Sequence, residues 1–108
     1  MSLLDANPVY KPFEYPWCYD AWLTQQQVHW LPEEVPLADD VKDWHHKLSE
    51  SEQHLMTQIF RFFTQSDIEV NNCYMKHYSR VFQPTEVQMM LAAFSNIETV
   101  HIAAYSHL

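Results

Sequence analysis

The chain contains 108 residues and no glycine. Average usage of about 7% would place roughly eight glycines in a chain of this length. Glycine forms the tight turns of dinucleotide fingerprints and phosphate loops, and it supplies the positive-φ positions of two-residue β-hairpins. The sequence therefore excludes Rossmann and P-loop nucleotide sites and disfavours hairpin-rich β folds. We expect an all-α protein.

The charge balance narrows the range of partners. Six Lys and Arg stand against 14 Asp and Glu, which gives a formal net charge of -8. Nucleic acids and anionic membranes are bound through clustered cations, so neither is expected as a partner. The longest apolar run, residues 89–94, is too short to cross a bilayer, and the N-terminus does not resemble a signal peptide. Cys18 and Cys73 match no zinc or CxxC spacing and are expected as buried thiols in a reduced cytosol, so the protein should be soluble and cytoplasmic.

Residues 1–48 form a region rich in proline and tryptophan. Prolines interrupt helices, which predicts an extended segment, a short helix over 19–27 and a turn over 32–36. The region also holds all four tryptophans, Trp17, Trp22, Trp30 and Trp44. We expect an ordered but irregular N-terminal arm that packs across a larger body.

Residues 49–108 carry the pattern of two long helices. Ser49 and Glu52 form a capping-box signature, and apolar residues then recur at spacings of three and four until about Arg80. Pro84 marks a second helix start, and its apolar pattern runs to residue 108 with no stop signal.

The lengths of these helices exceed what a small domain holds. At about 1.5 Å per residue they would be about 48 Å and 37 Å long, whereas a compact domain of this size is about 34 Å across. Such helices cannot cover each other's apolar surface as a lone hairpin. We therefore expect residues 49–108 to be the first part of a larger bundle that is either truncated or completed by another polypeptide.

Three polar residues of the second helix could carry chemistry. Glu98, His101 and Tyr105 fall on one face at about 100° per residue, and a Glu-x-x-His pair is the form in which ferritin-like bundles offer ligands to one metal of a dinuclear site. Asp67 lies in a largely apolar stretch of the first helix, where a carboxylate needs a partner or a metal. Taken singly, each has a plainer interpretation: Asp67 as a solvated residue, Tyr105 as a core aromatic and the Glu/His pair as coincidence. The remaining histidines of the central and C-terminal parts are expected to be surface or structural residues, namely His45, His46, His54, His77 and His107.

Taken together, these segments resemble the radical-generating small subunit of class I ribonucleotide reductase, over essentially the whole chain. The resemblance rests on Asn7-Pro8, Pro12-Phe13, Tyr15-Pro16-Trp17, Trp30-Leu31-Pro32-Glu33-Glu34-Val35, Phe62-Phe63-Thr64-Gln65-Ser66-Asp67, and Phe94-Ser95-Asn96-Ile97-Glu98-Thr99-Val100-His101 followed by Tyr105. It implies the N-terminal portion of a ferritin-like helical bundle preceded by an irregular arm.

The resemblance also implies roles for individual residues. Asp67, Glu98 and His101 would hold one half of a dinuclear iron or manganese centre, with Glu98 bridging to the second metal. Tyr105 would be the tyrosine that is oxidised to a stable radical, and Trp30 would conduct electrons toward the catalytic large subunit. The family would work as a homodimer of complete small subunits in the reduction of ribonucleotides to deoxyribonucleotides.

The family uses a further glutamate and a second Glu-x-x-His on later helices, and the sequence does not contain these. We therefore expect the chain to be inactive alone and to need a complementary C-terminal fragment that carries them. A natural split, cleavage and an intein-type interruption near residue 108 are equal alternatives at this point. Two other functions stay open: another ferritin-like dimetal oxidase, and a metal-free helical interaction module in which Asp67, Glu98 and His101 could each become alanine at little cost.

Overall fold

The computed structural model describes residues 2–107, and these residues contain helices and connecting segments but no strand. In chain order the elements are α1 (Pro16–Gln27), the 3₁₀ turn η1 (Pro32–Glu34), α2 (Ala38–His46), α3 (Glu50–Asn72), the π-helical turn η2 (Cys73–Tyr78), α4 (Ser79–Val81) and α5 (Thr85–His107). The all-α prediction is confirmed.

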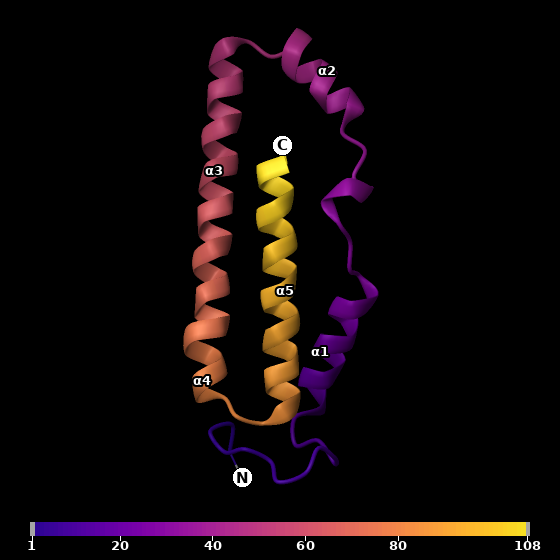
Figure 1. Cartoon of the computed structure of the whole chain (residues 1–108), viewed down its shortest axis with the longest axis vertical. Coiled ribbons are helices and arrows are strands. Elements are labelled where there is room, and N and C mark those ends of the chain that lie inside the picture. The colour runs from indigo at the N-terminus through magenta and orange to yellow at the C-terminus, as the bar shows by residue number, and fades with distance from the viewer. Residues whose placement is uncertain (1, 108) are drawn as a thin grey trace.

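The helices form one thin layer. α3 and α5 run antiparallel side by side, α1 lies on the other side of α5, and the N-terminal segment passes below their lower ends (Figure 1). The molecule measures 59 × 25 × 15 Å, so its shortest dimension is little more than the roughly 10–12 Å diameter of one helix. Its radius of gyration is 18.5 Å, against about 13 Å for a compact domain of this size. Both broad faces of the layer are open.

Burial is concentrated at one end of α5. Cys18 of α1 packs there with Val87, Met90 and Leu91 at the start of α5. In contrast, α3 contributes no buried residue, and Phe62 on it is 68% exposed. The two long helices thus leave much of their apolar surface uncovered, as their lengths indicated. None of the helices within residues 2–107 combines the length and the apolarity needed to cross a membrane.

The predicted helix over 49–80 is continuous, but it is not α-helical throughout. It begins as expected, because the Ser49 hydroxyl accepts a hydrogen bond from the Glu52 N–H at 3.2 Å and the Glu52 carboxylate accepts one from the Ser49 N–H at 3.1 Å. After Asn72 the α-helix continues as the π-helical turn η2, and the segment ends with α4. Periodicity alone did not reveal this turn, since it changes the spacing by only one residue.

The N-terminal region is more helical than predicted. α1 begins at Pro16, three residues before the expected start, because proline is well tolerated in the first turn of a helix. Residues 38–46, expected as irregular arm, form α2. A signal for α2 exists in the sequence, since Asp39 and Asp40 occupy its first turn and His45 and His46 its last, which complements the helix dipole.

A buried glutamate holds the N-terminal arm against α5. The Glu86 side chain, in the first turn of α5, is fully buried. Its Oε1 accepts a hydrogen bond from Asn7 Nδ2 at 3.0 Å, and its Oε2 accepts bonds from the backbone N–H groups of Glu14 at 3.0 Å and Tyr15 at 3.4 Å. These bonds tie the N-terminal arm to the start of α5. The role of Glu86 was not predicted from the sequence.

The prediction that both cysteines are buried is correct for Cys18 and wrong for Cys73. Cys18 is inaccessible to solvent, and burial together with the nearby Glu86 carboxylate raises the pKa of its thiol to about 11. Cys73 is exposed because it begins η2, and the segment formed by α3, η2 and α4 contributes no buried residue.

The two thiols should therefore react at very different rates in the folded chain. A thiol pKa of about 11 in place of 9.0 reduces the thiolate fraction at pH 8 by about 100-fold, before steric protection is counted. With iodoacetamide we expect Cys73 to be alkylated at least about 100 times faster than Cys18, as measured by peptide mass spectrometry over time. In denaturant both should react at similar rates. Equal rates in the native chain would contradict the burial of Cys18.

Candidate metal centre

Three potential metal ligands from two helices converge near the middle of the layer. Asp67 lies on α3 and Glu98 and His101 lie on α5, and each offers one ligand atom such that all three atoms lie within 4.8 Å of one another. Glu98 and His101 share a face because residues three apart on an α-helix are neighbours. The antiparallel packing of α3 on α5 brings Asp67, 31 positions earlier in the chain than Glu98, to that face.

The two carboxylates at this site lack hydrogen-bond partners. Asp67 Oδ2 and Glu98 Oε2 are both buried and accept no hydrogen bond. His101 Nδ1 lies 3.5 Å from Glu98 Oε2, a distance at which a protonated imidazole would pair with the carboxylate. Unpartnered buried carboxylate oxygens are rare because they lose hydration without compensation. A cation between them would supply that compensation, so the donor set fits a metal ion.

The ionisation of Glu98 reflects the same environment. Its pKa is raised, first by burial and then by the adjacent Asp67 carboxyl, while His101 opposes the shift. Without a cation, the protonated form of Glu98 is therefore favoured more than in water. A bound divalent metal would reverse this preference, because its charge is the largest in the site and favours the ionised carboxylate.

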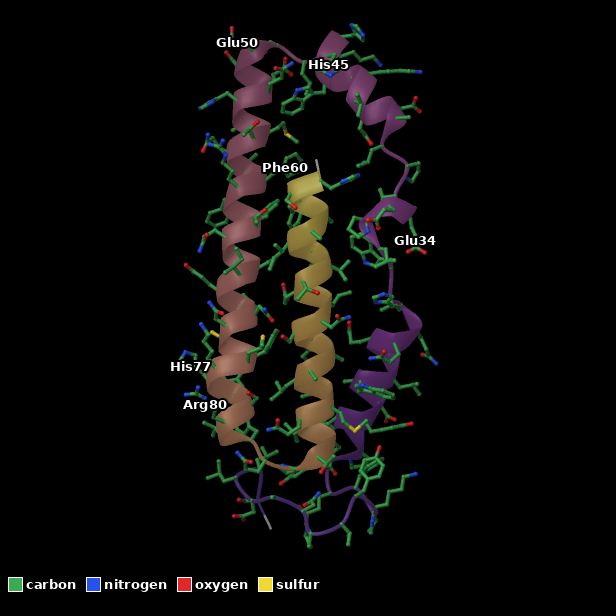
Figure 2. All side chains as sticks on the ribbon, in the orientation of Figure 1. Glu34, His45, Glu50, Phe60, His77 and Arg80 are labelled. Atoms are coloured by element: carbon green, nitrogen blue, oxygen red, sulfur yellow. The ribbon has the colours of Figure 1, made fainter. Side chains whose placement is uncertain are left out.

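The two aromatic residues expected to act in electron transfer, Trp30 and Tyr105, lie near His101. The centroid of the Trp30 indole is 6.3 Å from that of the His101 imidazole. The Tyr105 ring, one helical turn beyond His101, contacts two phenylalanines of α3, with centroid separations of 6.3 Å to Phe60 and 5.4 Å to Phe63. Phe60 points toward the C-terminal end of α5, whereas His77 and Arg80 point away from it (Figure 2).

A groove of about 990 Å³ opens beside Tyr105, lined by α2, by α3 as far as Gln65 and by the last turn of α5. Trp44, Met56 and Phe60 form much of its apolar wall. One side of the Tyr105 ring is thus packed on phenylalanine, and Tyr105 itself lines this groove. The five histidines expected to be surface or structural residues are all exposed, namely His45, His46, His54, His77 and His107.

Two polar residues next to the cluster were not predicted from the sequence. The Ser95 hydroxyl on α5 donates a hydrogen bond to Asn71 Oδ1 on α3. Asn71 follows Asp67 by four residues, and Ser95 precedes Glu98 by three, so each shares a face with a potential ligand. That spacing is a signal the sequence contains, but it becomes meaningful only when the two helices are known to be neighbours.

Comparison with known proteins assigns the chain to a family. The sequence model of the family described as ribonucleotide reductase, small chain, matches residues 7–108. The chain belongs to the ribonucleotide reductase small-chain family. The resemblance read from the arm and from the two long helices is thus confirmed, and the all-helical fold agrees with the ferritin-like bundle of that family.

Individual members of the ribonucleotide reductase small-chain family are similar over nearly the whole chain. Probable ribonucleoside-diphosphate reductase small subunits of invertebrate iridescent virus 3 and invertebrate iridescent virus 6 are 48% and 47% identical over all 108 residues. The small subunit of Dictyostelium discoideum is 31% identical over 90% of the chain. The chain spans only 28% to 30% of the length of these relatives.

Proposed function

We propose that this chain contributes one half of the dimetal centre of a ribonucleotide reductase small subunit, and so acts in the reduction of ribonucleotides to deoxyribonucleotides. The observation that carries the proposal is the convergence of Asp67, Glu98 and His101 within 4.8 Å, with two buried carboxylate oxygens that have no partner. Such unpartnered carboxylates disfavour the alternative of a metal-free interaction module. Membership of the family disfavours another dimetal oxidase.

Each ligand has a role that follows from its chemistry. Asp67 and Glu98 would hold iron, or alternatively manganese, through hard carboxylate oxygens, and Glu98 would reach toward the second metal. His101 would complete this half of the site through an imidazole nitrogen. When bound, the metal pair would react with oxygen and supply the oxidant for Tyr105.

The surrounding residues would keep and transmit the oxidising equivalent. Phe60 and Phe63 pack against Tyr105 and would shield that side of its ring from water. Trp30 lies against His101, so it is placed to conduct an electron between the metal site and the surface that would meet the large subunit. These roles for Tyr105 and Trp30 are part of the proposal.

Three ligands on two helices cannot enclose two metal ions, which together need more donors than this chain offers. We therefore propose that a complementary polypeptide segment supplies the remaining glutamate and the second Glu-x-x-His, and that the chain is inactive without it. The open faces of the layer offer the surface for those helices, and the first relatives are more than three times as long as this chain. Further proposed partners are the large subunit and a second copy of the complete small subunit.

Tyr105→Phe tests the proposal in the assembly that contains the complementary helices. The substitution removes only a hydroxyl, so we expect metal content to stay at about two ions per small subunit, while the tyrosyl radical signal in electron paramagnetic resonance disappears. Tyr78→Phe is the matched control, because Tyr78 is 46% exposed on η2, and it should retain the signal. A radical that persists in Tyr105→Phe would place it on another residue. A wild-type assembly that binds no metal would overturn the proposed function itself.

A further inference from the structure

A hydrogen bond between a buried and a half-buried side chain joins the two ligand-bearing helices. The donor is the Ser95 hydroxyl of α5 and the acceptor is Asn71 Oδ1 of α3. Ser95 is 9% exposed, and it is one of two buried polar residues in the part of the chain that the structure describes, the other being Glu86. A bond of this kind restricts the separation of the two helices more tightly than apolar packing does, since a displaced partner leaves the buried Ser95 hydroxyl unsatisfied.

The position of the bond relates it to the metal ligands. Asn71 lies about 6 Å along α3 from Asp67, and Ser95 lies about 4.5 Å along α5 from Glu98, at about 1.5 Å per residue. Because the helices are antiparallel, both displacements run toward the same end of the layer (Figure 1). The bond therefore joins α3 and α5 about one helical turn from the place where Asp67 faces Glu98.

The ligand cluster itself does not fix the separation of the two helices. Asp67 Oδ2 and Glu98 Oε2 are buried and have no hydrogen-bond partner. The separation of α3 from α5 at this point therefore depends on neighbouring contacts.

We propose that Asn71 and Ser95 are positioning residues for the metal centre. Their hydrogen bond holds Asp67 at the distance from Glu98 and His101 that one metal ion requires, and it thereby sets the metal affinity of this half-site. The inference rests on the proposed metal-binding function. If the bond served only to pack the helices, breaking it would change stability alone. The proposed role predicts in addition that breaking this bond, which touches no ligand, lowers the affinity for metal.

The test is a double-mutant cycle on metal affinity in the assembly with the complementary helices. Mn²⁺ is titrated into metal-free Ser95→Ala, Asn71→Ala and the double variant, and free Mn²⁺ is followed by electron paramagnetic resonance. We expect each single variant to bind about 10- to 100-fold more weakly, as is typical when a group that orients a ligand is removed. The double variant should be no weaker than the weaker single variant, because both substitutions break the same bond. Ser95→Thr keeps the hydroxyl and should restore most of the affinity.

A matched control separates positioning from stability. Asn7→Ala breaks another long-range side-chain hydrogen bond, to Glu86 at the far end of α5, and should lower the melting temperature while metal affinity stays unchanged. If Ser95→Ala and Asn71→Ala lower the melting temperature but bind Mn²⁺ within about twofold of the wild type, the proposal is wrong and the bond is only structural. If the wild type itself binds no Mn²⁺ or Fe²⁺, the proposed function fails as well.

A milder substitution, Ser95→Cys, tests the proposal even where the alanine variants do not fold. Ser95→Cys has nearly the volume of serine but donates a weaker hydrogen bond, so it preserves packing while loosening the contact. We expect it to bind Mn²⁺ several-fold more weakly than Ser95→Thr. Equal affinities for these two variants would overturn the proposal.

Discussion

Replacing His101 by alanine should weaken metal binding by more than about 100-fold, since loss of a direct ligand exceeds the 10- to 100-fold effect of losing a group that only orients one. His101 supplies the imidazole of a cluster whose other two members are carboxylates. Without it, the remaining two donors from this chain cannot fix one ion. Metal content of the purified assembly, measured by mass spectrometry after dialysis, should fall by at least one ion per small subunit.

The matched control for this prediction lies on the same helix. His107→Ala changes an exposed imidazole two turns further along α5 and should leave metal content unchanged. Asp67→Ala should behave like His101→Ala, and Glu69→Ala, an exposed carboxylate of α3, should behave like His107→Ala. If His101→Ala and His107→Ala retained equal metal, the cluster would not be the metal site.

Stability in the absence of metal gives this experiment a second readout. Asp67 and Glu98 carry unpartnered buried oxygens, and Asp67 contributes to the raised pKa of Glu98. Removing Asp67 from the metal-free protein should therefore leave the free energy of unfolding unchanged or increase it, because a poorly compensated buried carboxyl is lost. A residue that stabilises the fold would show the opposite sign.

Glu86→Ala should have the largest effect on stability, a loss of about 3 kcal/mol in the free energy of unfolding. The substitution leaves three donors of the arm without their acceptor, namely the Asn7 amide and the N–H groups of Glu14 and Tyr15. It also creates a space beside Cys18 in the apolar cluster where α1 meets α5. Urea denaturation followed by circular dichroism would measure the change.

Glu50→Ala is the control for Glu86→Ala. Glu50 also occupies the first turn of a long helix, but it is exposed, so its removal should cost less than about 1 kcal/mol through the helix dipole alone. Glu86→Gln keeps the shape and one acceptor oxygen and should fall between the two. Equal effects of Glu86→Ala and Glu50→Ala would show that the contacts of the arm contribute little.

The sequence predicted the features that depend on neighbours within one or two helical turns. The absence of glycine indicated an all-α fold, and the Ser49 and Glu52 signature indicated a helix start; the structure shows both. Glu98 and His101 share a face of α5 because they are three residues apart. Family membership was also accessible, because several segments of the family appear together in one chain. Even so, α2 was not predicted, because it lies in a region rich in proline and tryptophan. The sequence does contain acidic residues in its first turn and histidines in its last turn, which favour a helix.

The tertiary structure decided which of these residues meet and which are buried. By sequence, Glu86 looks like an ordinary first-turn carboxylate and Asn71 like a surface amide, yet their partners lie 79 and 24 positions away. Burial of Cys18 and exposure of Cys73 likewise depend on which helix faces are covered. Local sequence sets helix geometry and the face on which a side chain lies, whereas partners from distant segments are set by packing. The sequence by itself thus determined the two long helices and the candidate ligands, and only the packing of α3, α5 and the arm brought Asp67 to Glu98 and buried Glu86.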